Sequence, residues 1–200
     1  MKKERPILFS GPMVRAILEN RKTQTRRVVK CPIWMTKEVD MLNPASPHHY
    51  GDVSTIKPCP YGQPGDHLWV RESWNVSGLA FLRKPRETAF AAPSAWKYQA
   101  TDDGSWQRGW RPSIHMPRWA SRILLEIVSV RVERLQDISE EDALAEGVDF
   151  HCTDPTCLIC HGFCGIQCYR ELWEKINGTG SWDANPWVWV VEFKRIGGVA

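Results

Sequence analysis

Hydrophobic and polar positions follow a strand or helix period in several separate stretches of the chain. Residues 6–9 form a short apolar run typical of a buried strand, and apolar residues then recur at helical spacing over residues 13–18. Ser10 is a candidate N-cap for this helix, and Pro12 is tolerated in its first turn. The pattern therefore predicts a strand followed by a short amphipathic helix that ends near Asn20.

Four later segments have the alternation or the β-branched content of strands. The first follows a turn at Gln63-Pro64-Gly65-Asp66. In the longest, Val128, Val130 and Val132 alternate with polar residues, which predicts a long central strand. The predicted strands are residues 67–72, 95–99, 121–135 and 186–194.

A second helix is predicted to begin after Ser139 and to end at Gly147. Ser139 is a good N-cap, and Asp142 three residues later resembles the acid of a capping box. Gly147 suits the left-handed conformation that commonly closes a helix. Glu146 then lies at a helix C-terminus, where the dipole disfavours a carboxylate, so we expect a cationic neighbour or a raised pKa there. Residues 169–176 predict a third amphipathic helix.

The order of these elements predicts an α+β fold, a small mixed β-barrel with helices on its rim. Residues 1–200 are long enough for a single domain with a sizeable core. Three stretches lack periodicity, so we interpret them as insertions into that domain. They lie at about residues 31–60, 78–118 and 151–168.

The composition is that of an ordinary globular protein, and basic residues are concentrated at one end of the chain. The chain is 42% hydrophobic and 24% charged, without an apolar run long enough for a membrane span or a signal peptide. We therefore expect a cytoplasmic monomer without a membrane partner. The net charge is +3, yet residues 1–30 hold nine basic residues and two acidic ones. This basic end favours an anionic partner such as RNA or a nucleotide, and the alternative is a solvated basic terminus.

Two segments far apart in the chain carry the candidate chemistry. The first is Arg21-Lys22-Thr23-Gln24-Thr25-Arg26-Arg27, and the second is Ala145-Glu146-Gly147. A lysine, a threonine hydroxyl and a carboxylate on one rim are suited to hydrolysis. The same arginines are suited to a phosphate, while tryptophans can stack a base or, more often, pack loops onto a core. The candidate binding residues are Arg21, Arg26, Arg27 and Lys30 for phosphate, and Trp69, Arg71 and Trp74 around a base.

A cysteine-rich stretch lies between the second and third predicted helices. It holds His151, Cys152, Cys157, Cys160, His161, Cys164 and Cys168. The Cys-x2-Cys spacing favours a structural zinc ion bound by Cys152, Cys157, Cys160 and Cys164, with Cys168 or His161 as substitutes. A second Cys-x2-Cys pair is missing, so a set of free thiols is the alternative. We expect no metal in catalysis, because no open coordination position is evident.

These motifs, in this order, resemble the ASCH family of the PUA-like superfamily. A strand and helix lead to the Arg-Lys-Thr-x-Thr segment, a Pro-Gly-Asp turn precedes the next strand, and a later helix ends in Ala-Glu-Gly. The terminal strand carries Val191-Glu192-Phe193-Lys194. The matching segments span nearly the whole chain, whereas the insertions lie outside a minimal ASCH core. The longer layout is similar to bacteriophage and prophage ASCH proteins, which implies a bacterial host cell as the location.

The resemblance implies a five- or six-stranded barrel whose cleft faces RNA or a nucleoside. Some small bacterial ASCH proteins are amidohydrolases that remove the acetyl group from 4-acetylcytidine, and Lys22, Thr25 and Glu146 match their working residues. On this interpretation Thr25 is the nucleophile, neutral Lys22 its base and Glu146 the acid for the leaving amine. Lys22 and Glu146 would titrate as a coupled pair, and Arg26 or Arg27 would stabilise the oxyanion. No cofactor is required.

Three other functions stay open at this point. A non-catalytic RNA- or nucleotide-binding module would use the arginines and tryptophans, with Lys22 and Glu146 as a mere salt bridge. A ribonuclease would use Lys22 and Arg27 to stabilise the phosphorane and Glu146 as its base. The fourth interpretation is a phage or host interaction protein with a loop held by zinc.

Overall fold

The computed structural model describes residues 2–29, 58–77, 95–106, 109–148 and 165–197, and the following elements lie within these ranges. The main sheet contains β1 (Glu4–Leu8), β3 (His67–Arg71), β6 (Leu124–Arg134), β7 (Trp187–Arg195) and β2 (Gln24–Val28), in that spatial order. A smaller sheet pairs β4 (Trp74–Val76) with β5 (Trp96–Tyr98). The α-helices are α1 (Gly11–Leu18), α2 (Glu140–Ala145) and α3 (Gly165–Asn177). Short 3-10 helices occupy Gln99–Thr101, Ser113–His115, Arg118–Ala120 and Leu135–Asp137.

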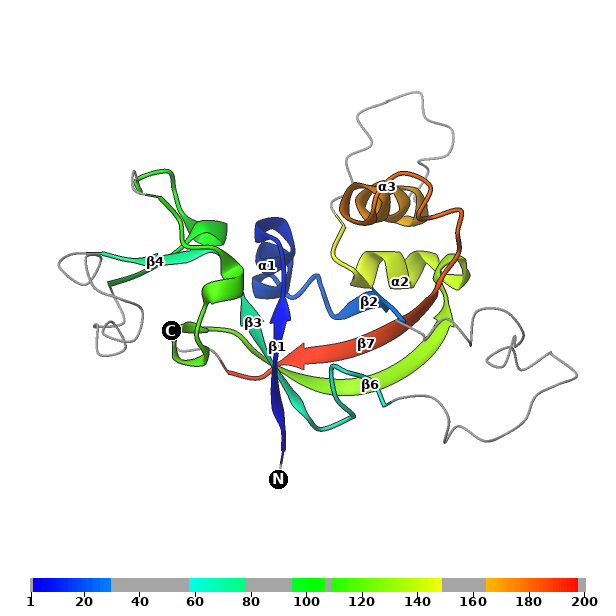
Figure 1. Cartoon of the computed structure of the whole chain (residues 1–200), viewed down its shortest axis with the longest axis horizontal. Coiled ribbons are helices and arrows are strands. Elements are labelled where there is room, and N and C mark those ends of the chain that lie inside the picture. Colours follow the sequence, from blue (N-terminus) through cyan, green and yellow to red (C-terminus); the bar gives the residue numbers. More distant parts are fainter. Residues whose placement is uncertain (1, 30–57, 78–94, 107–108, 149–164, 198–200) are drawn as a thin grey trace, which may run out of the picture.

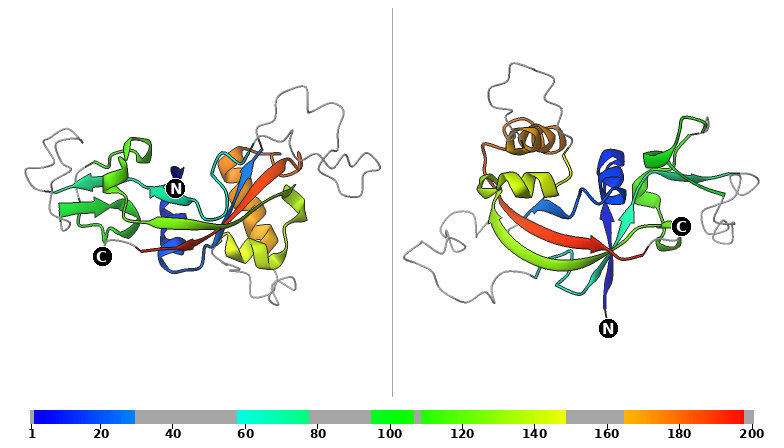
Figure 2. Two further views of the ribbon diagram at one scale, coloured as in Figure 1. Left: turned by 90° about the horizontal axis from the view of Figure 1, so that it is seen from below. Right: turned by 180° about the vertical axis from the view of Figure 1, so that it is seen from behind.

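The main sheet is mixed, because β1 pairs in parallel with β3 while the other neighbours are antiparallel. Figures 1 and 2 show the β4–β5 unit at one end of the molecule and α2 with α3 at the other, with the long strands β6 and β7 running between them. The α+β class predicted from the sequence is confirmed.

The predicted closed barrel is not formed by the strands described here. The outer strands of the sheet are β1 and β2, which do not pair with each other. Their connection contains α1, whose buried Val14 and Ile17 pack in one cluster with Ile7 and Phe9 beside β1. The helix thus packs against the cluster that includes Ile7 of β1, and β2 pairs with β7 at the other end of the sheet order.

Two hydrophobic clusters use opposite faces of β7. Val191 and Phe193 join the cluster that contains α1, whereas Val188 and Val190 join the cluster under α2 and α3. Side chains alternate between the two faces of a strand, so β7 is buried on both sides where these clusters meet it. This explains the nearly continuous apolar run of the terminal strand.

The sequence predicted most helices and strands at the right positions but missed strands β2 and β4. The Ser139 hydroxyl accepts a hydrogen bond from the Asp142 backbone N–H at 3.1 Å, and Gly147 closes α2 with a φ of 75°. Ser10 lies at the N-cap position of α1, but its side chain makes no capping hydrogen bond. Strand β2 lies within the basic segment, and β4 pairs with β5, the strand predicted at residues 95–99.

The structure describes parts of the second and third proposed insertions. The described part of the second one contains β5 and contributes Met116 to a small core with Trp74 and Ala120. The last residues of the third one belong to α3, which begins at Gly165. Among the described helices, none is long and apolar enough to cross a membrane.

Candidate functional site

The two segments singled out from the sequence meet through their backbones. The Thr23 N–H donates to the Ala145 carbonyl at 2.8 Å, which ties the start of β2 to the end of α2. A Cβ atom at Gly147 would lie 2.7 Å from the Lys22 Cβ and 2.9 Å from the Ala16 Cβ. Only glycine therefore fits here, both for its positive φ and for this close approach.

Lys22 is a buried cation that points at the end of α2. Its side chain has 0% exposure, and Nζ donates to Glu146 Oε2 and to the Glu146 carbonyl oxygen, each at 2.8 Å. The same Nζ lies 5.5 Å from the centre of the Phe9 ring. The carboxylate of Glu146 is 3% exposed, so the ion pair is shielded from water on both sides.

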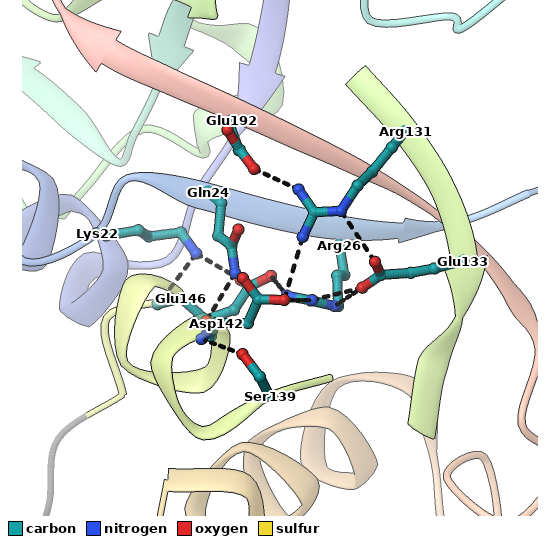
Figure 3. Close-up of polar contacts among 9 residues, drawn as sticks. All are labelled: Lys22, Gln24, Arg26, Arg131, Glu133, Ser139, Asp142, Glu146 and Glu192. Carbon is teal, nitrogen blue, oxygen red and sulfur yellow. Dashed lines mark hydrogen bonds and ion pairs between the residues drawn. The ribbon is translucent and has the colours of Figure 1, made fainter. Parts of the chain in front are cut away.

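Arg26 holds the other side of this carboxylate and links it to an ionic network (Figure 3). Its guanidinium lies 3.3 Å from Glu146 Oε1, 2.5 Å from Glu133 Oε1 and 2.7 Å from Asp142 Oδ2. Arg131 continues the network through Glu133, Asp142 and Glu192. The residues of this network are Lys22, Arg26, Arg131, Glu133, Asp142, Glu146 and Glu192.

Strand and helix geometry explains how these side chains converge. Gln24 and Arg26 are two residues apart in β2 and therefore point to the same face. Gln24 donates to the Asp142 carbonyl at 2.7 Å, and Arg26 reaches the Asp142 carboxylate. The Asp142 carboxylate thus joins the network, while its backbone N–H donates to the capping Ser139 hydroxyl.

A pocket of about 210 Å³ lies beside this network, between α1 and α3 along the edge strand β2. Thr25 and Glu146 both line it, and α3 contributes an aromatic and aliphatic wall. The lining residues are Met13, Thr25, Arg26, Arg27, Val28, Tyr61, Glu146, Tyr169, Leu172, Trp173, Ile176 and Asn177. Among the described residues, no hydrogen bond joins the Thr25 hydroxyl to Lys22 or Glu146.

Burial and the surrounding charges shift several pKa values in this region. Burial lowers the pKa of the Lys22 ammonium, and Glu146 opposes that shift without cancelling it. Burial acts to lower the pKa of Arg26, but the carboxylates of Glu146 and Glu133 raise it overall. Burial likewise acts to raise the pKa of Asp142, but Arg26, with Gln24 and Arg131, lowers it overall. Burial raises the pKa of the Tyr169 phenol well above its ordinary value, and Glu146 adds to the rise.

The basic residues predicted to bind phosphate are largely engaged by protein groups. Arg21 forms an exposed ion pair with Glu19 at 2.6 Å, and Arg26 is surrounded by carboxylates. Arg27 donates to the Leu8 carbonyl at 2.8 Å while it also lines the pocket. Lys30 lies outside the described residues.

The residues predicted to surround a base lie elsewhere in the fold. Trp74 is fully buried against Trp96 and Trp119, so its ring offers no face to a base. Trp69 is 7% exposed and is covered by the Arg71 guanidinium, 4.7 Å from its ring centre. Neither Trp69, Arg71 nor Trp74 lines the pocket.

The predicted zinc site falls mostly outside the described residues. Cys152, Cys157, Cys160, His161 and Cys164 all belong to that part of the chain. Cys168 is described, lies on α3 and packs, partly buried, against the core under α2 and α3. Within the described ranges, no group of three metal-ligating side chains is present.

Sequence reasoning missed the residues that support Glu146 and those that form the pocket wall. Arg131 and Glu133 alternate on β6 and could have been recognised as a polar face, but their pairing with Arg26 depends on strand order. Tyr169 and Trp173 were identified as the apolar face of a helix. Their place in the pocket follows from how α3 packs.

Comparisons with known proteins add little to this geometry. No family model and no curated protein matches the chain. Among solved structures, the crystal structure of protein EF3133 from Enterococcus faecalis V583, with the family model DUF984, aligns at a TM-score of 0.45 and 8% identity. The alignment covers 100% of this chain and 84% of that chain. A likeness at this level carries no argument about function.

Proposed function

We propose that this protein is an ASCH-type amidohydrolase that removes an acyl group from the exocyclic amine of a small planar substrate, such as an acylated cytidine. One observation carries the proposal: Thr25 and Glu146 line the same pocket, and Glu146 forms a buried ion pair with Lys22, whose Nζ lies 2.8 Å from Oε2. Thr25 can serve as a nucleophile and Glu146 as an acid at the cavity wall, and Lys22, which does not line the cavity, is the base bonded to Glu146.

In the proposed mechanism, proton transfer within the ion pair lets one lysine and one glutamate act as base and acid. Transfer of a proton from the Lys22 ammonium to Glu146 gives a neutral amine and a carboxylic acid, a change that burial favours. The amine accepts the Thr25 hydroxyl proton as Oγ bonds to the acyl carbon. Glu146 then protonates the amine nitrogen as the C–N bond breaks, which leaves an ester on Thr25 and restores the ion pair.

Hydrolysis of that ester uses the same two groups in the opposite direction. The Glu146 carboxylate accepts a proton from water as the water oxygen bonds to the acyl carbon. The Lys22 ammonium returns a proton to Thr25 Oγ as the ester bond breaks, and the carboxylic acid product is released. A proton then passes from Glu146 to Lys22, so both residues end in their starting states. Arg26 positions Glu146 throughout and does not contact substrate.

Size and charge favour a nucleoside over an RNA strand. The pocket volume of about 210 Å³ lies below the ~300–1,000 Å³ typical of drug-sized ligands, so it suits a single base with its acyl group. Tyr169, Trp173 and Leu172 supply apolar and aromatic surface for a planar ring. Arg21 and Arg26 are paired with carboxylates, which weakens the case for phosphate contacts along a strand.

The test is release of cytidine from 4-acetylcytidine, followed by chromatography. Wild type should release cytidine, while Thr25→Ala should lose turnover by orders of magnitude. Thr23→Ala is a matched control, because Thr23 is exposed and two residues away in the same segment. Glu146→Gln should also be inactive, with the exposed Glu141→Gln as its control. Shortened RNA in place of deacylation would favour a ribonuclease, and RNA retention without turnover would favour a binding module.

A further inference from the structure

Tyr169 on α3 is a polar group of the pocket wall that the mechanism above leaves without a role. Its side chain is only 3% exposed, and it lines the same pocket as Thr25 and Glu146. Buried tyrosine hydroxyls usually have a hydrogen-bond partner. Among the described residues, none of the hydrogen bonds involves the Tyr169 hydroxyl, so this group has its donor capacity free for a ligand.

Other donors of the pocket wall are bound to protein groups or are themselves buried: the Arg27 Nε and the Trp173 Nε1 have no hydrogen-bond partner among the described residues, but neither atom is exposed. Arg26 binds three carboxylates, and Arg27 donates to the Leu8 carbonyl. The Asn177 amide donates to the Trp173 carbonyl at 3.0 Å. The oxyanion role expected for Arg26 or Arg27 from the sequence is therefore poorly served by these engaged side chains, whereas the Tyr169 hydroxyl on the same wall makes no hydrogen bond among the described residues.

The Tyr169 ring is held in a fixed position by its aromatic neighbours. Its centre lies 6.1 Å from that of Trp173 and 6.3 Å from that of Trp182, in tilted and edge-on arrangements. All three residues belong to the buried cluster under α2 and α3. A donor on a rigid ring is preorganised, which is the property that transition-state stabilisation requires.

The surroundings of the Tyr169 hydroxyl favour donation of a hydrogen bond over transfer of its proton. Burial and the Glu146 carboxylate raise the pKa of the phenol, so the hydroxyl keeps its proton over the whole working range. Glu146 is the group that protonates the leaving amine in the proposed mechanism. Because Tyr169 and Glu146 line the same pocket, a carbonyl bonded to that amine has both residues in the wall around it.

We propose that the Tyr169 hydroxyl donates a hydrogen bond to the acyl carbonyl oxygen of the substrate and stabilises the negative charge that develops there. This inference rests on the proposed function. It makes α3, the helix that follows the cysteine-rich stretch, a part of the active site.

The test compares Tyr169→Phe with wild type in steady-state kinetics on 4-acetylcytidine. The substitution removes one oxygen that makes no hydrogen bond within the described protein, so the thermal midpoint should change little. The kcat should fall about 100-fold, with KM within about threefold of wild type. A role confined to packing would leave kcat unchanged.

Tyr98→Phe is the matched control. The Tyr98 hydroxyl donates to the Ala120 carbonyl at 3.0 Å in the small β4–β5 unit, outside the pocket. This variant should lower the thermal midpoint and leave kcat unchanged, the reverse of the pattern for Tyr169→Phe. An unchanged kcat in Tyr169→Phe, with or without a higher KM, would overturn the inference alone. Absence of turnover in wild type itself would instead refute the proposed function and the inference with it.

Discussion

Removal of either partner of the Lys22–Glu146 pair should destabilise the protein, and the two losses should not add. At 2.8 Å and an effective dielectric constant of about 20, the Coulomb attraction of the pair is ~6 kcal/mol before desolvation is subtracted. Loss of one member of a buried pair leaves the other charge uncompensated, which typically costs about 3–5 kcal/mol. The two single variants should fall at different ends of this range.

Lys22→Met should lie near the lower end, about 3 kcal/mol, because Arg26 still faces the Glu146 carboxylate at 3.3 Å. Glu146→Gln leaves the Lys22 ammonium buried without its carboxylate. The Lys22 ammonium can then lose its proton. From an ordinary lysine pKa of about 10.4, this deprotonation costs about 4.6 kcal/mol at pH 7. That figure is an upper limit for the cost of the unpaired charge.

Urea unfolding of wild type, both single variants and the double variant Lys22→Met/Glu146→Gln measures the coupling. The double variant should be more stable than the sum of the single losses predicts, by about 2–3 kcal/mol. The pH dependence gives a second readout. In Glu146→Gln the folded state binds fewer protons at residue 22 than the unfolded state, so its free energy of unfolding should rise by up to ~1.4 kcal/mol per pH unit between pH 7 and 10.

The exposed pair Lys194–Glu126 provides a matched cycle. Its nitrogen and oxygen lie 3.4 Å apart, with side-chain exposures of 60% and 24%. The cycle Lys194→Met/Glu126→Gln should give a much smaller coupling, because solvent screens this pair. Equal couplings in the two cycles, or a flat pH dependence for Glu146→Gln, would refute the reasoning that burial makes this pair strong.

Further predictions test the surroundings of the site. Gly147→Ala should destabilise the protein by about 2 kcal/mol more than Gly178→Ala, as measured by urea unfolding. Both glycines have a positive φ, but only the alanine at position 147 would place a Cβ atom 2.7 Å from the Lys22 Cβ. The pKa of Asp142 is lowered by folding, so its contribution to stability is present above its ordinary value of 3.8 and is lost as pH falls through the folded value. Asp142→Asn should lack this part of the acid slope in a circular dichroism titration. Trp74→Ala should cost about 3–5 kcal/mol in unfolding while nucleoside affinity of the folded protein stays unchanged, since the ring packs a core.

The sequence predicted structure best at positions where a single residue type determines the local backbone conformation. Gly147 and Ser139 fixed both ends of α2, because a left-handed closing residue and a hydroxyl cap are short-range requirements. The long strand β6 was visible from its β-branched residues, and the irregularity between Ile127 and Ser129 accounts for the exposed Val128 at its bend.

Non-local pairing explains most of what the sequence could not predict. β2 has few apolar residues, and its strand conformation depends on β7, which pairs Thr25 with Val191 and Arg26 with Val190. The ionic network depends on the order of β6, β7 and β2 together with the position of α2. A pattern of polar residues two apart on a strand indicates a face, but it does not identify the partner across that face.

The position of Glu146 illustrates how the site obtains its chemistry from the fold. A carboxylate at a helix C-terminus is unfavourable, and the sequence alone required a compensating cation or a raised pKa. The structure supplies Lys22, whose Nζ binds both the carboxylate and the carbonyl oxygen at that terminus. Arg26 is a weaker second partner, because it lies closer to Glu133 and Asp142, at 2.5 and 2.7 Å, than to Glu146 at 3.3 Å. Lys22 is therefore the nearest charged partner of Glu146, and in the proposed mechanism a proton that moves between these two residues prepares the acid and the base in one step.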